Sequence, residues 1–323
     1  MEYRVLGKTG VRVSVIGFGC GPVSGWMAEL GAEDQREVVR HAIEVGINWF
    51  DTAAGYGDGK SEASLGAALG HLGFPEGIHI ASKVRYLPEH LSNTRDHTHV
   101  SVAASLKRLG VKQIALLQLH NSITAIRGEE PTSVTPLDVL GKGGVLEAFR
   151  ELQAEGRVEH IGLTGIGQAA ALREVICSDT FDTMQVPYSL LNPSAGRLVP
   201  PDFHETDYGN IIADCGSRAM GVFAIRVFAG GALLGNLPSA HTLKTPFFPL
   251  ALYERDRVRA DSLTALLPPG QTLHGAALQF ALAHPHLSSA IIGFRTPAEI
   301  DSAITALASP QLPGNLIAAA LMA

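Results

Sequence analysis

Four polar residues stand where their side chains could transfer a proton: Asp51, Tyr56, Lys83 and His120. A tyrosine phenol has an ordinary pKa of about 10, which is too high for ready proton exchange at neutral pH. A neighbouring ammonium group favours the phenolate and lowers that pKa, while a carboxylate holds the ammonium charged and in place. Asp51, Lys83 and Tyr56 could therefore form an acid–base unit that is tuned toward the operating pH.

His120 adds a second capability, because an imidazole can donate a hydrogen bond to a carbonyl oxygen and orient the substrate. The chemistry that these side chains would support is proton transfer coupled to a bond change at a carbonyl carbon. None of them is a source of hydride, so a bound cofactor would have to supply it.

The elements that must position these residues form a repeating series of short apolar strands and amphipathic helices. This alternation predicts a parallel sheet, and the strands fit a single (β/α)8 TIM barrel that spans residues 1–323 as one domain. The pattern around Lys8–Gly10 predicts a short N-terminal β-hairpin before the first barrel strand. The predicted barrel strands are Val15–Gly19, Ile47–Asp51, Ile78–Lys83, Ile114–His120, His160–Thr164, Thr183–Val186, Gly221–Val227 and Ala290–Gly293.

These strands give the four polar residues a common position. Asp51, Lys83 and His120 end the second, third and fourth strands, and Tyr56 lies in the glycine-rich loop after Asp51. Active sites of such barrels lie at the C-terminal ends of the strands, so we expect all four at one rim. Each has a structural explanation when taken alone, such as a turn cap for Asp51 or a solvated charge for Lys83. Their joint position at successive strand ends favours the catalytic interpretation.

Helices are predicted between the strands, and two of them end at Gly46 and Gly110, a residue type suited to the position after a helix. Residues 123–143 and 230–267 are expected to be long loops after the fourth and seventh strands. The apolar C-terminal segment 316–323 is expected to form a helix that packs on the barrel.

Composition excludes several classes of partner. The net charge is -6 and no run of like charges occurs, so a nucleic-acid partner is not expected. No apolar run approaches the roughly 18 residues of a membrane span, and the N-terminus does not resemble a signal peptide. The three cysteines lie far apart, which predicts no metal site and indicates reduced thiols in the cytoplasm. The sequence does not indicate the oligomeric state.

Three glycine-rich segments are poor matches to nucleotide-binding motifs. GFGCGP after the first strand lacks the third glycine of the dinucleotide fingerprint. AGYGDGKS at residues 54–61 begins with alanine where a P-loop has glycine, and GIGQAA at residues 165–170 lacks the acidic residue expected about 20 positions later. Nucleoside-triphosphate hydrolysis and a doubly wound fold are therefore disfavoured.

At the polar residues the sequence resembles the aldo-keto reductase family. The resemblance runs from about Tyr3 to Leu307 and includes GINWFDTAAGYGDGKSEASLG, ASKV, LLQLHN, QVPYSLLN and IIGFRTPAEI in order. It implies a (β/α)8 barrel, NAD(P)(H) bound across the rim, and an Asp51–Tyr56–Lys83–His120 tetrad. In that tetrad Tyr56 is the general acid and base, Lys83 and Asp51 tune it, and His120 orients a carbonyl or sugar substrate.

The resemblance also implies residues that contact the cofactor. Thr164 and Gln185 fall where the family contacts the nicotinamide carboxamide, although Gly165 replaces a common asparagine beside Thr164. Ile225 stands where an aromatic ring usually stacks on the nicotinamide, and Arg226 beside it could serve phosphate or substrate. The backbone of the loop Phe228–Gly231, with Gly230 and Gly231, corresponds to the approach to the pyrophosphate.

The adenosine end departs from the common pattern of the family. Gly293 replaces a lysine, and Glu299 replaces an arginine that often grips the 2′-phosphate. A carboxylate repels a phosphate but accepts hydrogen bonds from a free ribose hydroxyl, so Glu299 favours NAD over NADP. Arg295 could still supply a phosphate contact.

The RVFAGGAL segment is similar to the aldose-dehydrogenase-like branch of the family, and this similarity implies sugar or hydroxy-aldehyde substrates.

Two other functions stay open on the sequence. Lys83 could act as the nucleophile of a Schiff-base lyase, which requires a lysine that is not held in a tight ion pair. Alternatively, the chain could be a nicotinamide-binding regulatory subunit with little turnover, although the intact tetrad argues against it.

Overall fold

The chain begins with an antiparallel hairpin in which β1 (Tyr3–Val5) pairs with β2 (Arg12–Ser14). In this computed structural model the turn is a short 3-10 helix, η1 (Gly7–Thr9), that ends at Gly10 with a φ of 75°. The predicted hairpin is confirmed. The structure describes residues 1–244, 250–308, 312 and 316, so nearly all of the expected C-terminal helix lies outside the described residues.

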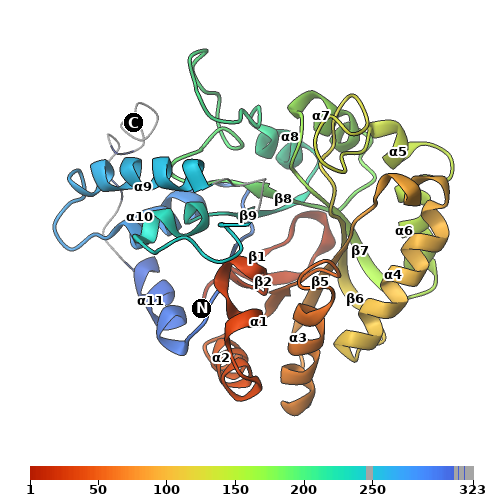
Figure 1. The fold of residues 1–323 in the computed structure, drawn as a ribbon, viewed down its shortest axis with the longest axis horizontal. Helices are drawn as coiled ribbons and strands as arrows, with labels where there is room; N and C mark the ends of the chain where they lie inside the picture. The colour runs from red at the N-terminus through yellow and green to blue at the C-terminus, as the bar shows by residue number, and fades with distance from the viewer. Residues whose placement is uncertain (245–249, 309–311, 313–315, 317–323) are drawn as a thin grey trace.

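Within the described residues, eight parallel strands close into a barrel in the order β10-β3-β4-β5-β6-β7-β8-β9 (Figure 1). All eight predicted strands are present, with bounds that differ from the predictions by at most two residues, and the predicted barrel is confirmed. The sequence pattern sufficed because strands covered on both faces are nearly continuous apolar runs. The strands are β3 (Ile16–Gly19), β4 (Trp49–Asp51), β5 (His79–Val84), β6 (Ile114–Leu119), β7 (Val158–Thr164), β8 (Thr183–Pro187), β9 (Gly221–Ile225) and β10 (Ser289–Ile292).

Helices surround the barrel and alternate with its strands (Figure 1). Gly46 after α2 and Gly110 after α4 have φ angles of 94° and 71°, so both glycines occupy the left-handed conformation that closes a helix. The helices are α1 (Trp26–Glu29), α2 (Ala32–Glu44), α3 (Lys60–His71), α4 (Thr94–Leu109), α5 (Pro136–Leu140), α6 (Val145–Ala154), α7 (Ala169–Cys177), α8 (Ile211–Ser217), α9 (Leu250–Thr264), α10 (Leu273–Leu282) and α11 (Pro297–Leu307). No helix in this part of the chain combines the length and apolar character of a membrane span.

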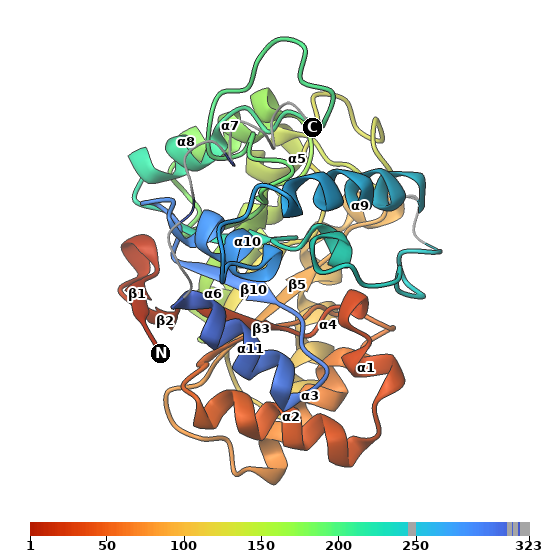
Figure 2. The ribbon, with the colours of Figure 1, turned by 90° about the vertical axis from the view of Figure 1, so that its left-hand side faces the viewer.

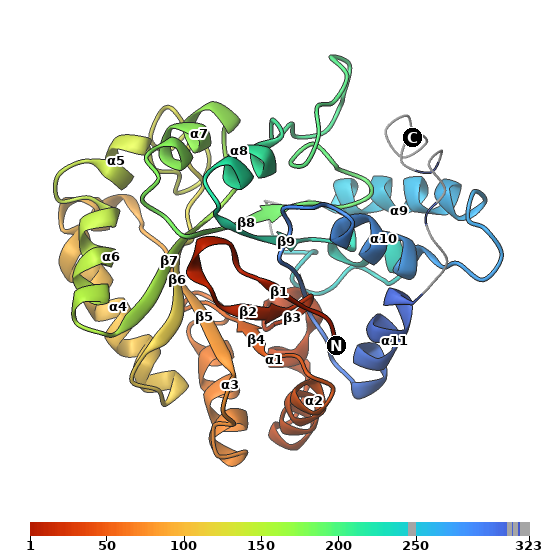
Figure 3. The ribbon, with the colours of Figure 1, turned by 180° about the vertical axis from the view of Figure 1, so that it is seen from behind.

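The hairpin covers one end of the barrel (Figure 3). Its loop donates from the backbone N–H of Lys8 to the carbonyl of Ala219, just before β9, so it lies at the N-terminal ends of the strands. Leu6 and Val13 are fully buried there, in one cluster with Trp49. Figure 2 shows the hairpin on one side of the barrel and α1 and α9 toward the other. Because the hairpin covers the N-terminal end of the barrel, the C-terminal end is the one that can hold an active site.

Both segments predicted as long loops contain helices, so these two predictions are wrong in part. Residues 230–267 include most of η4 (Ala229–Leu234) and all of α9, and residues 123–143 include α5. The buried face of α9 carries Asp256 and Arg259 besides apolar residues, which hides its helical period. The start of α5 did carry a signal, because Thr135 accepts a hydrogen bond from the backbone N–H of Asp138 and Pro136 follows it.

Candidate active site

The four polar residues converge at the C-terminal rim. Asp51 is the last residue of β4, Lys83 lies near the end of β5, and His120 directly follows β6. The Lys83 Nζ donates to the Asp51 carboxylate, to the Thr52 carbonyl at 2.9 Å and to the Tyr56 hydroxyl at 3.4 Å. Lys83 is 1% exposed. A buried ammonium therefore joins the carboxylate to the phenol.

Tyr56 and His120 form the face of this group that a substrate would meet. Their rings contact edge to face, with centroids 5.5 Å apart. Burial, together with the positive charges of Lys83 and Arg85, holds the pKa of His120 well below its ordinary value. The imidazole is therefore neutral, with one N–H to donate and one nitrogen to accept.

The electrostatics of Tyr56 differ from the prediction. Burial raises the pKa of the phenol above its ordinary value, and the nearby charge of Lys83 offsets this effect only in part. Burial also lowers the pKa of Lys83, but the attraction of Asp51 and Tyr56 outweighs it, so the lysine pKa is raised. The predicted lowering by Lys83 is therefore present, but burial outweighs it. Tyr56 stays protonated beside a charged ammonium.

Asp51 is held by two amides as well as by Lys83. Gln118 donates from Nε2 to Asp51 Oδ2 at 3.2 Å, and Gln185 donates to the same oxygen. Gln118 is fully buried, and its Oε1 has no hydrogen-bond partner. Sequence reasoning missed Gln118, although its position two residues before His120 on β6 places both on one side of the strand. These hydrogen bonds fix the orientation of the carboxylate.

A cavity of about 1500 Å³ opens above the tetrad. Of the tetrad, Asp51, Tyr56 and His120 line it, whereas Lys83 lies beneath. A drug-sized ligand site is roughly 300–1,000 Å³, so this cavity has room for a dinucleotide and a substrate. All residues predicted to contact a cofactor line it: Thr164, Gln185, Ile225, Arg226, Phe228, Gly230, Gly231, Gly293, Arg295 and Glu299.

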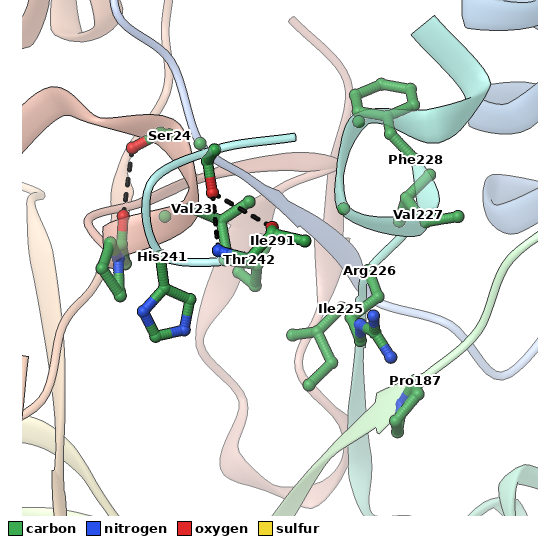
Figure 4. A pocket seen from close by; sticks show the side chains of 18 of the residues that line it. Val23, Ser24, Pro187, Ile225, Arg226, Val227, Phe228, His241, Thr242 and Ile291 are labelled. Carbon is green, nitrogen blue, oxygen red and sulfur yellow. Dashed lines mark hydrogen bonds between the residues drawn. The ribbon is translucent and has the colours of Figure 1, made fainter. Parts of the chain in front are cut away.

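The cavity walls fit an extended dinucleotide in the nicotinamide region. Figure 4 shows Ile225 and Arg226 on one side of the cavity and His241 and Thr242 on the other. Arg226 has a φ of 59°, a conformation that non-glycine residues adopt rarely and often at functional sites. Burial lowers its pKa to about 10, which leaves the guanidinium charged at neutral pH.

Glycines bring the backbone close to the cavity at the pyrophosphate and adenosine positions. Gly230 and Gly231 have φ angles of 70° and 106°, which side chains resist. The N–H of Gly231 donates to the Phe228 carbonyl at 2.9 Å, so this predicted phosphate donor has an internal acceptor. A Cβ on Gly293 would stand 2.6 Å from the Ser24 Cβ, so the lysine common at this position would not fit.

Several predicted cofactor contacts also have partners within the protein. The Thr164 hydroxyl donates to the Leu119 carbonyl at 2.9 Å. Glu299 accepts from the backbone N–H of Arg295 at 2.7 Å, and the Arg295 guanidinium lies 3.0 Å from a Glu29 oxygen. Glu299 therefore also stabilises the start of α11.

A hydrogen-bonded group of ionisable residues beneath a large cavity at the C-terminal rim of a (β/α)8 barrel is the arrangement expected of an enzyme active site. Residues 15–319 match the model of the Aldo/keto reductase family, and the chain belongs to this family. It is thus an NAD(P)-dependent oxidoreductase of carbonyl compounds. The predicted family and enzyme class are confirmed.

Individual relatives agree with this family. The chain is 24% identical to L-galactose dehydrogenase of Arabidopsis thaliana, over 95% of this chain and 88% of the relative. This similarity agrees with the predicted aldose-dehydrogenase-like branch. It is also 24% identical to a putative voltage-gated potassium channel subunit beta of Schizosaccharomyces pombe, over 93% and 86% of the two chains. Among solved structures, an aldo-keto reductase of Bacillus halodurans in its holo form has a TM-score of 0.70 at 22% identity, covering 99% and 95% of the two chains.

Proposed function

We propose that the chain reduces a carbonyl group with Tyr56 as the general acid and oxidises the alcohol with the same residue as the base. The observation that carries this proposal is the contact of the Lys83 ammonium with both the Tyr56 hydroxyl and the Asp51 carboxylate. A nicotinamide cofactor, when bound, would supply or accept the hydride.

In reduction, the Tyr56 hydroxyl gives its proton to the carbonyl oxygen as that oxygen gains negative charge. The adjacent ammonium of Lys83 stabilises the phenolate that remains, and Asp51 keeps Lys83 charged. Neutral His120 donates a hydrogen bond to the same oxygen and fixes the carbonyl against Tyr56. Oxidation of an alcohol runs through the same atoms in reverse.

The cofactor preference belongs to the same proposal. Thr164 and Gln185 would hold the carboxamide, and Ile225 would provide apolar contact in place of a stacked ring. Glu299 supports NAD over NADP, because its carboxylate repels a 2′-phosphate.

We further propose sugars or hydroxy-aldehydes as substrates, and one barrel domain as the catalytic unit. A cytoplasmic location is also proposed, which is consistent with three free cysteines.

The Schiff-base alternative receives little support. A nucleophilic lysine needs an accessible, uncharged amine. Lys83 instead donates to Asp51, Thr52 and Tyr56, and its pKa is raised.

A regulatory subunit is the second candidate, because one relative is named as a channel subunit. The experiment that separates the candidates follows the absorbance of reduced nicotinamide. Purified protein is given NAD or NADP, in either redox state, with a panel of aldehydes, ketones and sugars. We expect turnover with at least one carbonyl–alcohol pair. Cofactor binding without turnover of any compound would favour the regulatory subunit, and absence of both would contradict the proposal.

A further inference from the structure

One wall of the cavity above Tyr56 carries an arginine that the proton-transfer group does not require. Arg85 follows β5 directly and stands two residues after Lys83, so both side chains leave the chain on the same side. Lys83 lies beneath the cavity, whereas Arg85 lines it together with Tyr56 and His120. Arg85 therefore lines the same cavity as the two residues that would contact a carbonyl.

The charge of Arg85 reaches both residues that would contact a carbonyl. It contributes to the low pKa of His120, after burial and Lys83. Burial lowers the pKa of Arg85 itself, and Tyr56 partly opposes this effect. These electrostatic interactions of Arg85 with His120 and Tyr56 agree with the finding that all three residues line the same cavity.

A buried amide fixes this arginine and the loop that faces it. Arg85 donates from Nε to the Thr132 hydroxyl at 3.2 Å. Asn121, which is 1% exposed, donates from Nδ2 to the carbonyls of Thr132 at 2.5 Å and Tyr86 at 2.7 Å. Its Oδ1 accepts from the Tyr86 N–H at 2.9 Å. Asn121 therefore anchors the backbone next to Arg85 and the Thr132 segment that accepts a hydrogen bond from Arg85.

We propose that Arg85 binds a carboxylate of the substrate, so that the preferred substrates are carbonyl compounds, including members of the proposed sugars and hydroxy-aldehydes, that carry a carboxylate. This inference rests on the proposed function and names its substrate class. A guanidinium has five N–H donors in a planar fork and matches a carboxylate with two parallel hydrogen bonds. Glu130 lines the same cavity, and its charge disfavours a doubly charged phosphate more than a carboxylate.

The test compares a charged and an uncharged form of one aldehyde, 4-formylbenzoate and its methyl ester, and the variants separate the effect of charge from the intrinsic reactivity of the two compounds. Their kcat/KM values are measured with wild type, Arg85→Gln, Arg85→Lys and the control Arg95→Gln. Arg95 is an exposed arginine on α4 that pairs with Glu151 at 2.7 Å, away from the cavity lining. Wild type should prefer the acid by about tenfold or more, the gain typical of a charge-assisted pair.

Arg85→Gln should abolish this preference by slowing the acid and not the ester. Arg85→Lys should retain part of it, and Arg95→Gln all of it. Equal use of acid and ester by wild type, or an unchanged preference in Arg85→Gln, would overturn the role of Arg85 and leave the reductase assignment intact. Failure of wild type to reduce either aldehyde or any compound of the wider panel would instead overturn the proposed function, and this inference with it.

Discussion

The floor of the cavity, formed by the C-terminal ends of the strands, and the outer rim of segments around it differ in how they are held. On the floor, Asp51, Lys83, Gln118 and Gln185 are at most 3% exposed and form one hydrogen-bonded group on consecutive or facing strands. The rim is built from long segments between elements, and its polar contacts are partly exposed. The comparison indicates that the strand ends hold the tetrad in one rigid arrangement, whereas the surrounding segments are held by more exposed contacts.

The rim contact between α9 and the segment after β8 illustrates the difference. Glu205 lies 2.9 Å from Arg259 and 2.5 Å from Arg255, which is 45% exposed. Arg259 also donates to the Leu191 carbonyl at 3.0 Å. Solvent screens the pair with Arg255, whereas the Arg259 and Glu205 side chains are only 9% and 15% exposed.

The largest effect is expected from Lys83→Met. This change leaves Asp51 buried without its cation and removes the charge that stabilises the phenolate of Tyr56. Turnover should fall by roughly 10³-fold, and the free energy of unfolding should fall by about 3–5 kcal/mol. Steady-state kinetics and urea denaturation measure the two losses. Near-normal turnover of this variant would contradict the proposed role of Lys83 in the mechanism.

The pH dependence should separate the two directions of the reaction. Because the pKa of Tyr56 is raised above 10.0, the phenol is fully protonated at neutral pH. Reduction should therefore be independent of pH between about 6 and 9, and oxidation should rise about tenfold per pH unit over that range when proton transfer limits it. Since His120 is neutral, neither profile should bend near pH 6.5. Such a bend would show that the imidazole titrates.

A smaller effect, about tenfold in kcat, is expected from Gln118→Met. The variant keeps the size of the side chain but removes the donor to Asp51. It also removes an unpartnered buried oxygen, so stability should change little. The cofactor dissociation constant should stay unchanged, whereas Gln185→Met should weaken both kcat and cofactor binding. Equal effects of the two substitutions on cofactor binding would contradict a positioning role for Gln118.

The smallest catalytic effect is expected from Arg259→Met on the rim. Loss of its hydrogen bonds to Glu205 and Leu191 should lower the free energy of unfolding by about 1.5–3 kcal/mol. Because no catalytic atom moves, kcat should stay within about threefold of wild type, as expected for a change outside the reacting group. Thermal denaturation and kinetics on the best substrate measure both. A drop in kcat as large as that of Gln118→Met would contradict the expectation that changes at the rim affect catalysis less than changes at the floor.

The sequence predicted the barrel and the meeting of the tetrad because both follow from local patterns. Each strand is a short apolar run, and parallel topology brings the ends of successive strands together. In contrast, α9 was missed because its buried face contains Asp256 and Arg259. Charged residues that are buried as partners cannot be distinguished from exposed ones in the sequence.

The electrostatics and the second layer of the site required three dimensions. The raised pKa of Tyr56 depends on how deeply the phenol is buried, which no spacing reveals. Gln118 and Arg85 did leave a signal, since each stands two residues from a tetrad member on its strand. That signal becomes interpretable only once the side of the strand facing the barrel interior is known.

The central claim is that the phenol of Tyr56 transfers the proton. Its most direct test is Tyr56→Phe, with turnover and the cofactor dissociation constant measured on the same preparation. We expect turnover to fall roughly 10²-fold or more while cofactor affinity is retained, because the ring stays and only the acid is lost. Turnover close to that of wild type, with cofactor bound normally, would contradict the account.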